Sequence, residues 1–334
     1  MASRSASAKL SSLSSLSGIW TSKRRAPSRG KADGSRSRLV PATSLRGVSG
    51  TVIVTDSTAS LPAEVALERD IRVVPLQVVI GARVLDEGPD GATPDVVAEA
   101  LRDFVPVSTS RPSPALLAEL YRDLAAAGAD EIVSVHLSRE MSGTFESAQL
   151  AAREVDVPVH VVDSGQVGIA TGYAALTAAD VRDTGGSGEV AAEAARARGL
   201  AATSLFYVDT LEYLRRGGRI GAAAAIFGSA LSVKPLLEIA GGRVVPRERV
   251  RTASRALARL ADLAVEAAGD AAVDVCVSHL ANADRAEELA AALTERLAAG
   301  LERREVMCGE LGAVLGAHVG PGMVAVCVSP RPTS

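Results

Sequence analysis

The sequence has few aromatic residues, few cysteines and no long apolar run, and each shortage excludes a class of protein. Aromatic residues make up 3% of the 334 residues, so a buried core must consist mainly of Ala, Val and Leu. Cys276, Cys308 and Cys327 are widely spaced and form no Cys/His pattern that would bind zinc, so we expect free thiols in a reducing cytosol. No apolar run approaches the roughly 18–20 residues of a membrane-spanning helix. We therefore expect a soluble, cytoplasmic protein.

Charge is distributed unevenly along the chain. Residues 1–48 contain ten Lys or Arg and one acid, a net charge of +9, whereas the remaining residues contain 26 basic and 38 acidic side chains, a net charge of −12. The acidic part argues against nucleic acid as a main partner. Residues 1–48 are rich in Ser, Arg, Ala and Pro without a helical or strand period, which predicts a disordered tail. A transit peptide and upstream sequence from a wrong start codon are alternative interpretations of this segment.

From residue 50 onward, apolar runs alternate with amphipathic segments, which is typical of an α/β fold. This alternation predicts a mostly parallel N-terminal sheet with flanking helices, followed by a second, C-terminal α/β sandwich. Hairpins are predicted around Gly81 and at Gly241-Gly242. We expect two α/β domains, residues 49–200 and 201–330, with a ligand site between them.

Some local predictions are specific enough to be tested directly. Residues 72–80 are expected to form one strand of the Gly81 hairpin, and Ser60 is expected to cap the helix after the first strand. A helix is predicted at 222–229, and Val306 is expected in a short strand. The region around His318 is expected to be a rigid loop because Gly-Pro-Gly follows it.

Three polar segments, each beside an expected strand, are the candidate functional site. They are residues 108–113 (STSRPS), 142–144 (SGT) and 318–322 (HVGPG). Ligands of open α/β sheets bind beyond the carboxyl ends of the strands, and clustered hydroxyls with one histidine suit an anionic oxygen. A purely structural role is the alternative, because Ser113 can cap a helix and 142–144 can begin one. No G-x-S-x-G elbow marks a nucleophilic serine.

The basic turn Arg215-Arg216-Gly217-Gly218-Arg219 has three interpretations: it binds phosphate, docks an acidic partner or simply ends a helix. The chain has no Walker motif and no G-x-G-x-x-G after a strand, so we expect no nucleotide binding by this chain alone. Asp56, Asp163 and Asp209 end strands, but their spacing gives no metal signature. The other histidines are expected to be satisfied core residues.

Taken in order, seven segments resemble the DegV family from about residue 50 to 329. They are Val54-Thr55-Asp56-Ser57-Thr58, Thr109-Ser110-Arg111-Pro112-Ser113, Leu137 through Ser147 (LSREMSGTFES), Val162-Asp163-Ser164, Leu211 through Gly221 (LEYLRRGGRIG), Lys234-Pro235 and His318-Val319-Gly320-Pro321-Gly322. The family often has glutamine where Arg111 stands.

This resemblance implies a two-domain α/β protein that holds one long-chain fatty acid in an internal tunnel. In bacteria, such members act as the acyl-carrier subunit of fatty-acid kinase, while a separate ATP-binding subunit phosphorylates the acid. The resemblance implies no catalytic residue, metal or cofactor in this chain, and it allows peripheral membrane contact for lipid exchange. The implied contacts of the fatty-acid carboxylate are Thr109, Ser142 and His318, with Ser110 and Thr144 nearby.

Arg215, Arg216 and Arg219 are weaker candidates, either near the head group or on the kinase-docking face. The alternative function is an enzyme in its own right, using Ser142 or Thr144 with His318 in acyl transfer or hydrolysis. Another alternative is a binder of a small phosphorylated or keto substrate. A regulatory DNA binder is disfavoured by the acidic folded part and the lack of a recognisable recognition helix.

Overall fold

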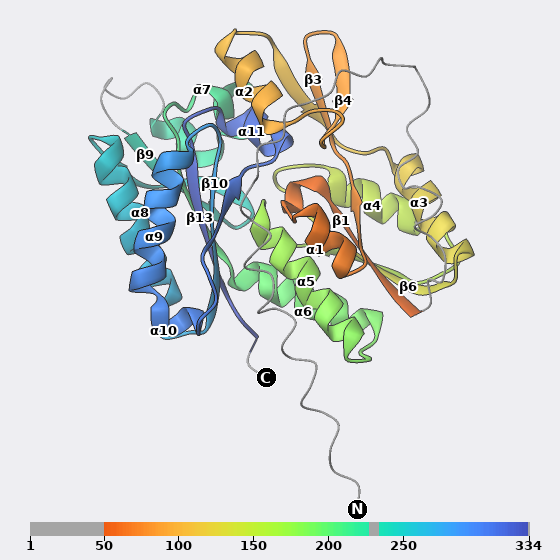
Figure 1. Ribbon diagram of the computed structural model, residues 1–334. Coiled ribbons are helices and arrows are strands. Elements are labelled where there is room, and N and C mark those ends of the chain that lie inside the picture. The colour runs from red at the N-terminus through yellow and green to blue at the C-terminus, as the bar shows by residue number, and fades with distance from the viewer. Residues whose placement is uncertain (1–49, 227–233, 333–334) are drawn as a thin grey trace, which may run out of the picture.

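Three β-sheets organise the chain in the computed structural model, which describes residues 50–226 and 234–332 (Figure 1). The predicted mixed α/β fold is confirmed, with a four-stranded, a six-stranded and a three-stranded sheet. Figure 1 shows the larger sheet and its helices on the left, the first sheet on the right, and β3 and β4 above them. The basic tail of residues 1–48 lies outside the described residues. The domain boundary near residue 200 stays a prediction.

The first sheet is entirely parallel and is covered by helices on both faces. Its strands, in spatial order, are β2 (Ile71–Val74), β1 (Gly50–Asp56), β6 (Ala129–His136) and β7 (Val159–Asp163). Its helices are α1 (Ala63–Glu68), α3 (Pro114–Ala126), α4 (Thr144–Ala152), α5 (Ile169–Asp183) and α6 (Gly188–Ala201). Val52 and Val54 pack against α3 and α4, whereas Ile53 packs against α5 and α6 on the other face. Alternate side chains point to opposite faces, so a strand buried on both sides needs a continuous apolar run.

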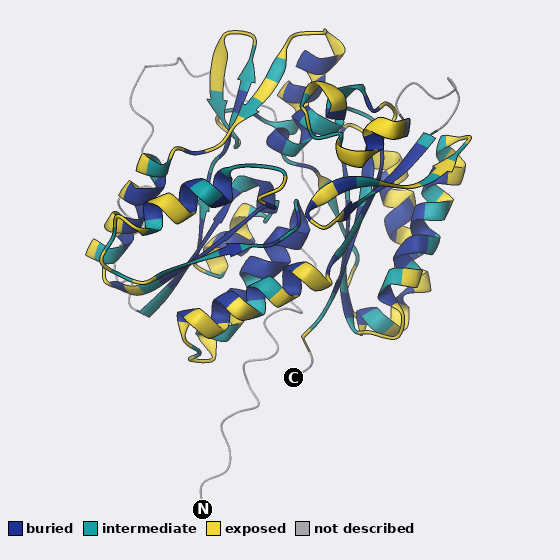
Figure 2. Cartoon of the chain, turned by 180° about the vertical axis from the view of Figure 1, so that it is seen from behind, coloured by how far each residue is buried: buried dark blue, intermediate teal, exposed yellow. Residues whose placement is uncertain are grey.

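The six-stranded sheet is antiparallel except for the pairing of β11 with β12. Its strands, in spatial order, are β10 (Arg243–Val250), β9 (Lys234–Ala240), β8 (Thr203–Tyr207), β13 (Val324–Pro330), β11 (Val273–His279) and β12 (Met307–Glu310). Its helices are α7 (Glu212–Arg216), α8 (Ala253–Ala268), α9 (Ala283–Arg296) and α10 (Ala298–Leu301). Leu260 and Ala264 of α8 pack on Val324 and Val326. Figure 2 shows exposed residues on the outward faces of such helices and buried residues against the sheets.

The small sheet joins segments that are far apart in the sequence. It consists of β4 (Arg83–Asp86), β3 (Gln77–Ile80) and β5 (Val107–Ser110), all antiparallel, and it packs against α2 (Pro94–Arg102) and α11 (Ala313–Val319). Val78, Val97 and Val314 are buried in one cluster. Helix α11 therefore brings the C-terminal part of the chain onto a strand that begins more than 200 residues earlier.

Several local predictions were wrong. Residues 72–80 do not form one strand: β2 ends at Val74, β3 begins at Gln77 in another sheet, and Pro75 lies between them. Proline has no N–H to donate, which ends the first pairing. Ser60 caps no helix; its φ is 52°, and it ends a short 3-10 turn, while α1 begins at Ala63 without a side-chain cap.

Two further predictions differ in their ends. The predicted helix 222–229 is a 3-10 segment at Gly221–Ile226, and its remaining residues lie outside the described part. Val306 immediately precedes β12, which begins at Met307. Strand ends are set by pairing with a neighbour, here β11, which a single-sequence pattern does not reveal.

Candidate ligand-binding site

A cavity of about 410 Å³ lies where the three sheets meet, and most of its wall is apolar. The larger sheet contributes Phe206, Ile239 and Ala325, and α11 contributes Val314 and Leu315. Both the small sheet and the loop after β6 reach the cavity as well. Cavities of this size with apolar walls and a few convergent polar groups are typical of small-molecule sites.

The charged groups of the cavity wall all have one sign. Among the described residues that line the cavity, Arg111 and Arg219 are charged, and none is Asp or Glu. Guanidinium groups carry their charge at every physiological pH, so the wall is positive wherever it is charged. An apolar ligand with an anionic end would match this wall.

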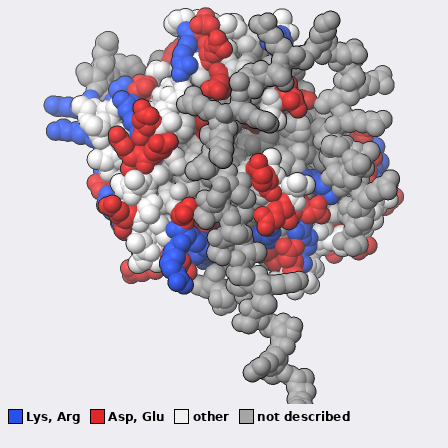
Figure 3. Space-filling view, in the orientation of Figure 1, with Lys and Arg blue, Asp and Glu red and all other residues white. Residues whose placement is uncertain are grey.

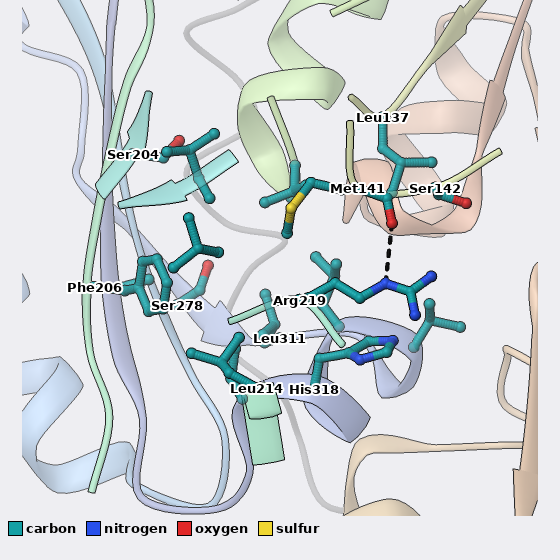
Figure 4. A pocket seen from close by; sticks show the side chains of 18 of the residues that line it. Leu137, Met141, Ser142, Ser204, Phe206, Leu214, Arg219, Ser278, Leu311 and His318 are labelled. Carbon is teal, nitrogen blue, oxygen red and sulfur yellow. Dashed lines mark hydrogen bonds between the residues drawn. The ribbon is translucent and has the colours of Figure 1, made fainter. Parts of the chain in front are cut away.

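Polar side chains gather at one end of the cavity. Figure 4 shows Ser142, Arg219 and His318 on one side, with Phe206 and Ser278 on the other. The Thr109 hydroxyl lies 2.8 Å from Nε2 of His318, although 209 residues separate the two in the chain. The Ser142 hydroxyl lies 2.9 Å from that of Thr144. Four of the five predicted carboxylate contacts therefore form two hydrogen-bonded pairs.

These pairs differ in their access to the cavity. Thr109, Ser142 and His318 line it, whereas Thr144 is fully buried and holds the Ser142 hydroxyl from behind. The chain positions Ser142 because its backbone N–H bonds to the Ser138 carbonyl in a tight turn just before α4 begins. Thr144 thus supports the site without touching the cavity.

Ser110 does not join this cluster. It borders the cavity, but its hydroxyl donates to Oε1 of Gln77 at 3.1 Å. Thr109 pairs with Val78 and Ser110 pairs with Gln77, so the two neighbours lie on opposite faces of the small sheet. The run of hydroxyls in the sequence could not distinguish these faces without the register of β5.

His318 lies in the last turn of α11, so the prediction of a loop at this position was wrong. Gly320, with φ of 76°, ends the helix two residues later. The helix is only seven residues long and is held by tertiary contacts, notably the packing of Val314 and Ala317 against the small sheet. Helices this short are not stable by themselves, so local sequence signals are weak.

The imidazole of His318 is neutral at pH 7. Burial, together with the nearby Arg219 guanidinium, lowers its pKa to about 4. Its Nδ1 atom is buried and has no hydrogen-bond partner among the described residues. If the single ring proton is on Nε2, that N–H donates to Thr109, and the Thr109 hydroxyl is free to donate to an anion.

The three arginines of the basic turn have different positions. Arg219 donates from Nε to the Met141 carbonyl at 3.1 Å, drawn as a dashed line in Figure 4, and from Nη1 to the Gly217 carbonyl at 2.6 Å. Its guanidinium therefore reaches the cavity from the C-terminal half of the chain. Arg215 and Arg216 do not line the cavity; both bond to Glu212, whose pKa these hydrogen bonds lower to about 2.

Sequence analysis missed one acidic residue that supports the site. Oε1 of Glu87 accepts a hydrogen bond from the Val314 backbone N–H at 2.9 Å, at the start of α11. Burial raises the pKa of Glu87. A Cβ at Gly312 would lie 2.5 Å from Glu87 Oε1, so a larger residue there would require this carboxylate to shift. Only the tertiary contact of the β4 end with α11 identifies this role, since the sequence around Glu87 resembles an ordinary turn.

The other histidines bind groups of the protein itself. His136 is fully buried, with Nδ1 2.9 Å from Asp56 and Nε2 2.8 Å from Ser134. His160 lies 3.4 Å from Glu131, and Nδ1 of His279 accepts from the Asn282 backbone N–H.

No metal-binding group of three or more His, Cys, Asp or Glu occurs within residues 50–226 and 234–332. Cys276 and Cys327 are buried free thiols, and Cys308 is a partly buried one. None of the described helices is long and apolar enough to cross a membrane. On the face in Figure 3, acidic and basic side chains lie side by side without a continuous basic surface among the described residues.

Comparison with known proteins places this chain in a family. Residues 51–331 match the profile of a family described as "Uncharacterised protein, DegV family". The chain is 54% identical over 279 residues to a DegV domain-containing protein of Streptomyces coelicolor, covering 84% of this chain and 98% of that protein. It is 35% identical to the protein DegV of Bacillus subtilis, covering 82% and 97% of the two chains.

Solved structures give the same result. A DegV family protein from Thermus thermophilus, described in terms of fatty-acid binding, superposes with a TM-score of 0.77 at 33% identity, covering 84% of this chain and 99% of that one. DegV of Bacillus subtilis, described as a fatty acid binding protein, gives a TM-score of 0.76 at 32% identity, covering 85% and 100%. This chain belongs to the DegV family.

Proposed function

We propose that this protein binds one long-chain fatty acid and presents its carboxylate to a separate ATP-dependent fatty-acid kinase subunit. One observation carries the proposal: an apolar cavity ends in hydroxyl, imidazole and guanidinium groups, and no acid lines it in the described part of the chain. Family relatives from Thermus thermophilus and Bacillus subtilis are described as binding fatty acids. The acyl chain would occupy the apolar end, and the carboxylate would lie near Thr109, Ser142 and His318.

The energetics of such a ligand favour a carrier. Burying about fifteen methylenes at roughly 0.8 kcal/mol each gives a gross gain on the order of 12 kcal/mol, before the costs of association. A buried carboxylate is unfavourable unless hydrogen-bond donors replace its lost water. Hydroxyls of Thr109 and Ser142 and the guanidinium of Arg219 supply these donors. The ligand would leave slowly, so chemistry on the protein-held lipid is more effective than release and recapture.

The proposed reaction is a phosphoryl transfer from a nucleotide held by the partner. A carboxylate oxygen attacks the γ-phosphorus of ATP, the bond to the bridging oxygen breaks, and ADP leaves. Donors that bind the ionised carboxylate keep its pKa low, so the attacking oxygen stays unprotonated. The present chain would supply binding and orientation, with no catalytic residue of its own. Loading would take place at a membrane surface by peripheral contact.

The hydrogen bonds of the site count against a stand-alone acyl transferase or hydrolase. Nε2 of His318 contacts Thr109, and the Ser142 hydroxyl contacts Thr144 instead. A serine nucleophile needs a base within hydrogen-bond reach of its own hydroxyl. A small phosphorylated metabolite is disfavoured for another reason, because most of the cavity wall would contact it with apolar side chains.

Native mass spectrometry of the purified chain, followed by solvent extraction, tests ligand binding. The proposal predicts a mass increment of one fatty acid per chain, released as one or two acyl species. Folded protein without such an increment, which also fails to take up added fatty acid, would contradict it.

The kinase step needs a second experiment. Lipid-loaded protein is incubated with ATP and hydroxylamine, with and without the ATP-binding kinase subunit encoded by the same organism. Hydroxylamine traps acyl phosphate as a hydroxamate, so the product is expected only when the kinase subunit is present. Hydroxamate formed by the isolated chain would favour an enzyme in its own right.

A further inference from the structure

Arg111 is a second guanidinium at the polar end of the cavity, and the proposed carboxylate site does not use it. It lines the cavity yet is exposed to solvent, so the cavity opens to the surface beside it. In the described part of the chain, this side chain makes no hydrogen bond or ion pair. An exposed arginine beside an apolar cavity without an acidic partner has all five N–H donors available to a ligand.

Hydrogen bonds of the backbone and of a helix cap fix the position of Arg111 in the chain. Ser110, on its N-terminal side, pairs with Gln77 in the small sheet. Pro112 follows, and Ser113 caps α3 by accepting a hydrogen bond from the Leu116 N–H. The root of the side chain is therefore fixed between a strand end and a helix start.

Gly143 creates the space in which the guanidinium lies. A Cβ built on Gly143 would lie 1.5 Å from Nη1 and 2.6 Å from Cζ of Arg111. The φ of Gly143 is −76°, which any residue adopts, so its backbone conformation does not require glycine. An alanine here would therefore require the Arg111 guanidinium to move. The guanidinium thus lies directly against the segment that carries Ser142 and Thr144.

We infer that Arg111 binds the phosphoryl group of an acyl phosphate and so determines which head group the site retains best. This inference rests on the proposed function. An acyl phosphate extends beyond the carboxyl group by one phosphoryl group and carries more negative charge. With the acyl chain inside, that extra group must project toward solvent, where Arg111 lies. Guanidinium groups bind phosphoryl oxygens in a bidentate manner, which a single carboxylate already held by Thr109 and Ser142 does not need.

The test compares two head groups on one acyl chain. Affinities of a long-chain fatty acid and of the alkylphosphonate of equal length are measured by calorimetry on delipidated full-length protein, at a pH where the phosphonate carries two charges. In Arg111→Gln, the phosphonate is expected to lose roughly tenfold or more in affinity, and the fatty acid less than about threefold. Arg122→Gln, an exposed arginine on α3 that is paired with Glu154, is the control for the lost charge and should change neither affinity.

A second variant displaces Arg111 without changing it. In Gly143→Ala, the new methyl group would occupy the position of the guanidinium, so the same selective loss of phosphonate binding is expected. An unchanged ratio of the two affinities in Arg111→Gln would overturn the inference while leaving the proposed function intact. If wild-type protein binds neither ligand, the proposed function itself fails.

Discussion

His136, which is fully buried, and His318, which is partly buried, differ in their hydrogen bonds, and the difference distinguishes a structural role from a ligand-binding one. Both ring nitrogens of His136 form hydrogen bonds inside the protein, to Asp56 and to Ser134. The Ser134 hydroxyl in turn lies 2.8 Å from the Tyr121 hydroxyl. His318 has one nitrogen bonded to Thr109 and leaves Nδ1 without a partner among the described residues.

Hydrogen-bond partners, rather than residue type, therefore distinguish a structural histidine from a ligand-binding one. Most buried polar groups are satisfied in folded proteins, and each exception needs an explanation. None of Asp56, Ser134 and His136 lines the cavity, and their hydrogen bonds hold two neighbouring strands, β1 and β6, together. His318 lies on the cavity wall, which also carries the guanidiniums of Arg111 and Arg219. The first network is therefore assigned to stability and the second to ligand binding.

The largest effect is expected from removing the acid of the saturated network. Asp56 accepts hydrogen bonds from His136, from Thr58 and from the Leu137 backbone N–H, and all lie in the interior. Asp56→Ala should lower the free energy of unfolding by about 3 kcal/mol, because it leaves buried donors unpaired. Urea denaturation measures this loss, with the exposed Asp156→Ala as control. A loss below about 1 kcal/mol would contradict the assignment of the Asp56–His136 network to stability.

The next effect concerns the unsaturated site. Thr109→Ala combined with His318→Ala should weaken fatty-acid binding roughly 10- to 100-fold, because the Thr109 donor to the carboxylate and the imidazole that orients its hydroxyl are lost. Stability should change far less than in Asp56→Ala. Displacement of a fluorescent fatty acid measures the affinity, and Arg122→Gln is a control away from the cavity. A double variant that keeps the wild-type affinity would show that the carboxylate lies elsewhere.

A pH effect sharpens the comparison further. The pKa of His318 is lowered from 6.5 to about 4, so between these values the unfolded chain binds more protons than the folded one. Stability of the lipid-free protein should therefore fall as the pH decreases from 6.5 toward 4. His318→Asn should reduce this slope, while His279, whose pKa burial also lowers, keeps its share in both proteins. If the free energy of unfolding depends on pH identically in wild type and His318→Asn, the pKa of His318 is not lowered in the folded protein.

The smallest effect is expected for Arg215, at the exposed end of the basic turn. Arg215 and Arg216 are exposed and bonded to Glu212, away from the cavity, whereas Arg219 lines it. Arg215→Gln should change fatty-acid affinity by less than about twofold, because exposed pairs contribute little. Arg219→Gln should weaken binding clearly in the same displacement assay. Equal effects of the two variants would show that the whole turn, rather than Arg219 alone, meets the head group.

Much of the fold could be predicted because the signals are local. Helices α3 and α8 and strand β11 begin and end where caps and apolar periods in the sequence mark them directly. The failures involve tertiary context. Pro75 divides the segment 72–80 between two sheets, and the seven-residue α11 depends on packing against the small sheet.

The candidate site was predictable in residue type but not in pairing. Thr109, Ser142, Thr144 and His318 could be singled out from their motifs, yet which hydroxyl meets the histidine depends on contact between β5 and α11. Ser110 was grouped with Thr109 because sequence alone does not give the face of a four-residue strand. The role of Glu87 could not be predicted from the sequence, because it depends on a hydrogen bond to Val314, which lies 227 residues further along the chain.

The most direct test of the central claim follows the carboxyl group of the bound ligand itself. Protein is loaded with fatty acid carrying ¹³C at the carboxyl carbon, and its ¹³C chemical shift is recorded as the pH is lowered. The account predicts one bound species whose carboxyl pKa lies well below its usual range, because hydroxyl and guanidinium donors hold the ionised form. This pKa should return toward the usual range in Thr109→Ala with His318→Ala. A bound carboxyl group that titrates normally, and identically in both proteins, would contradict the account.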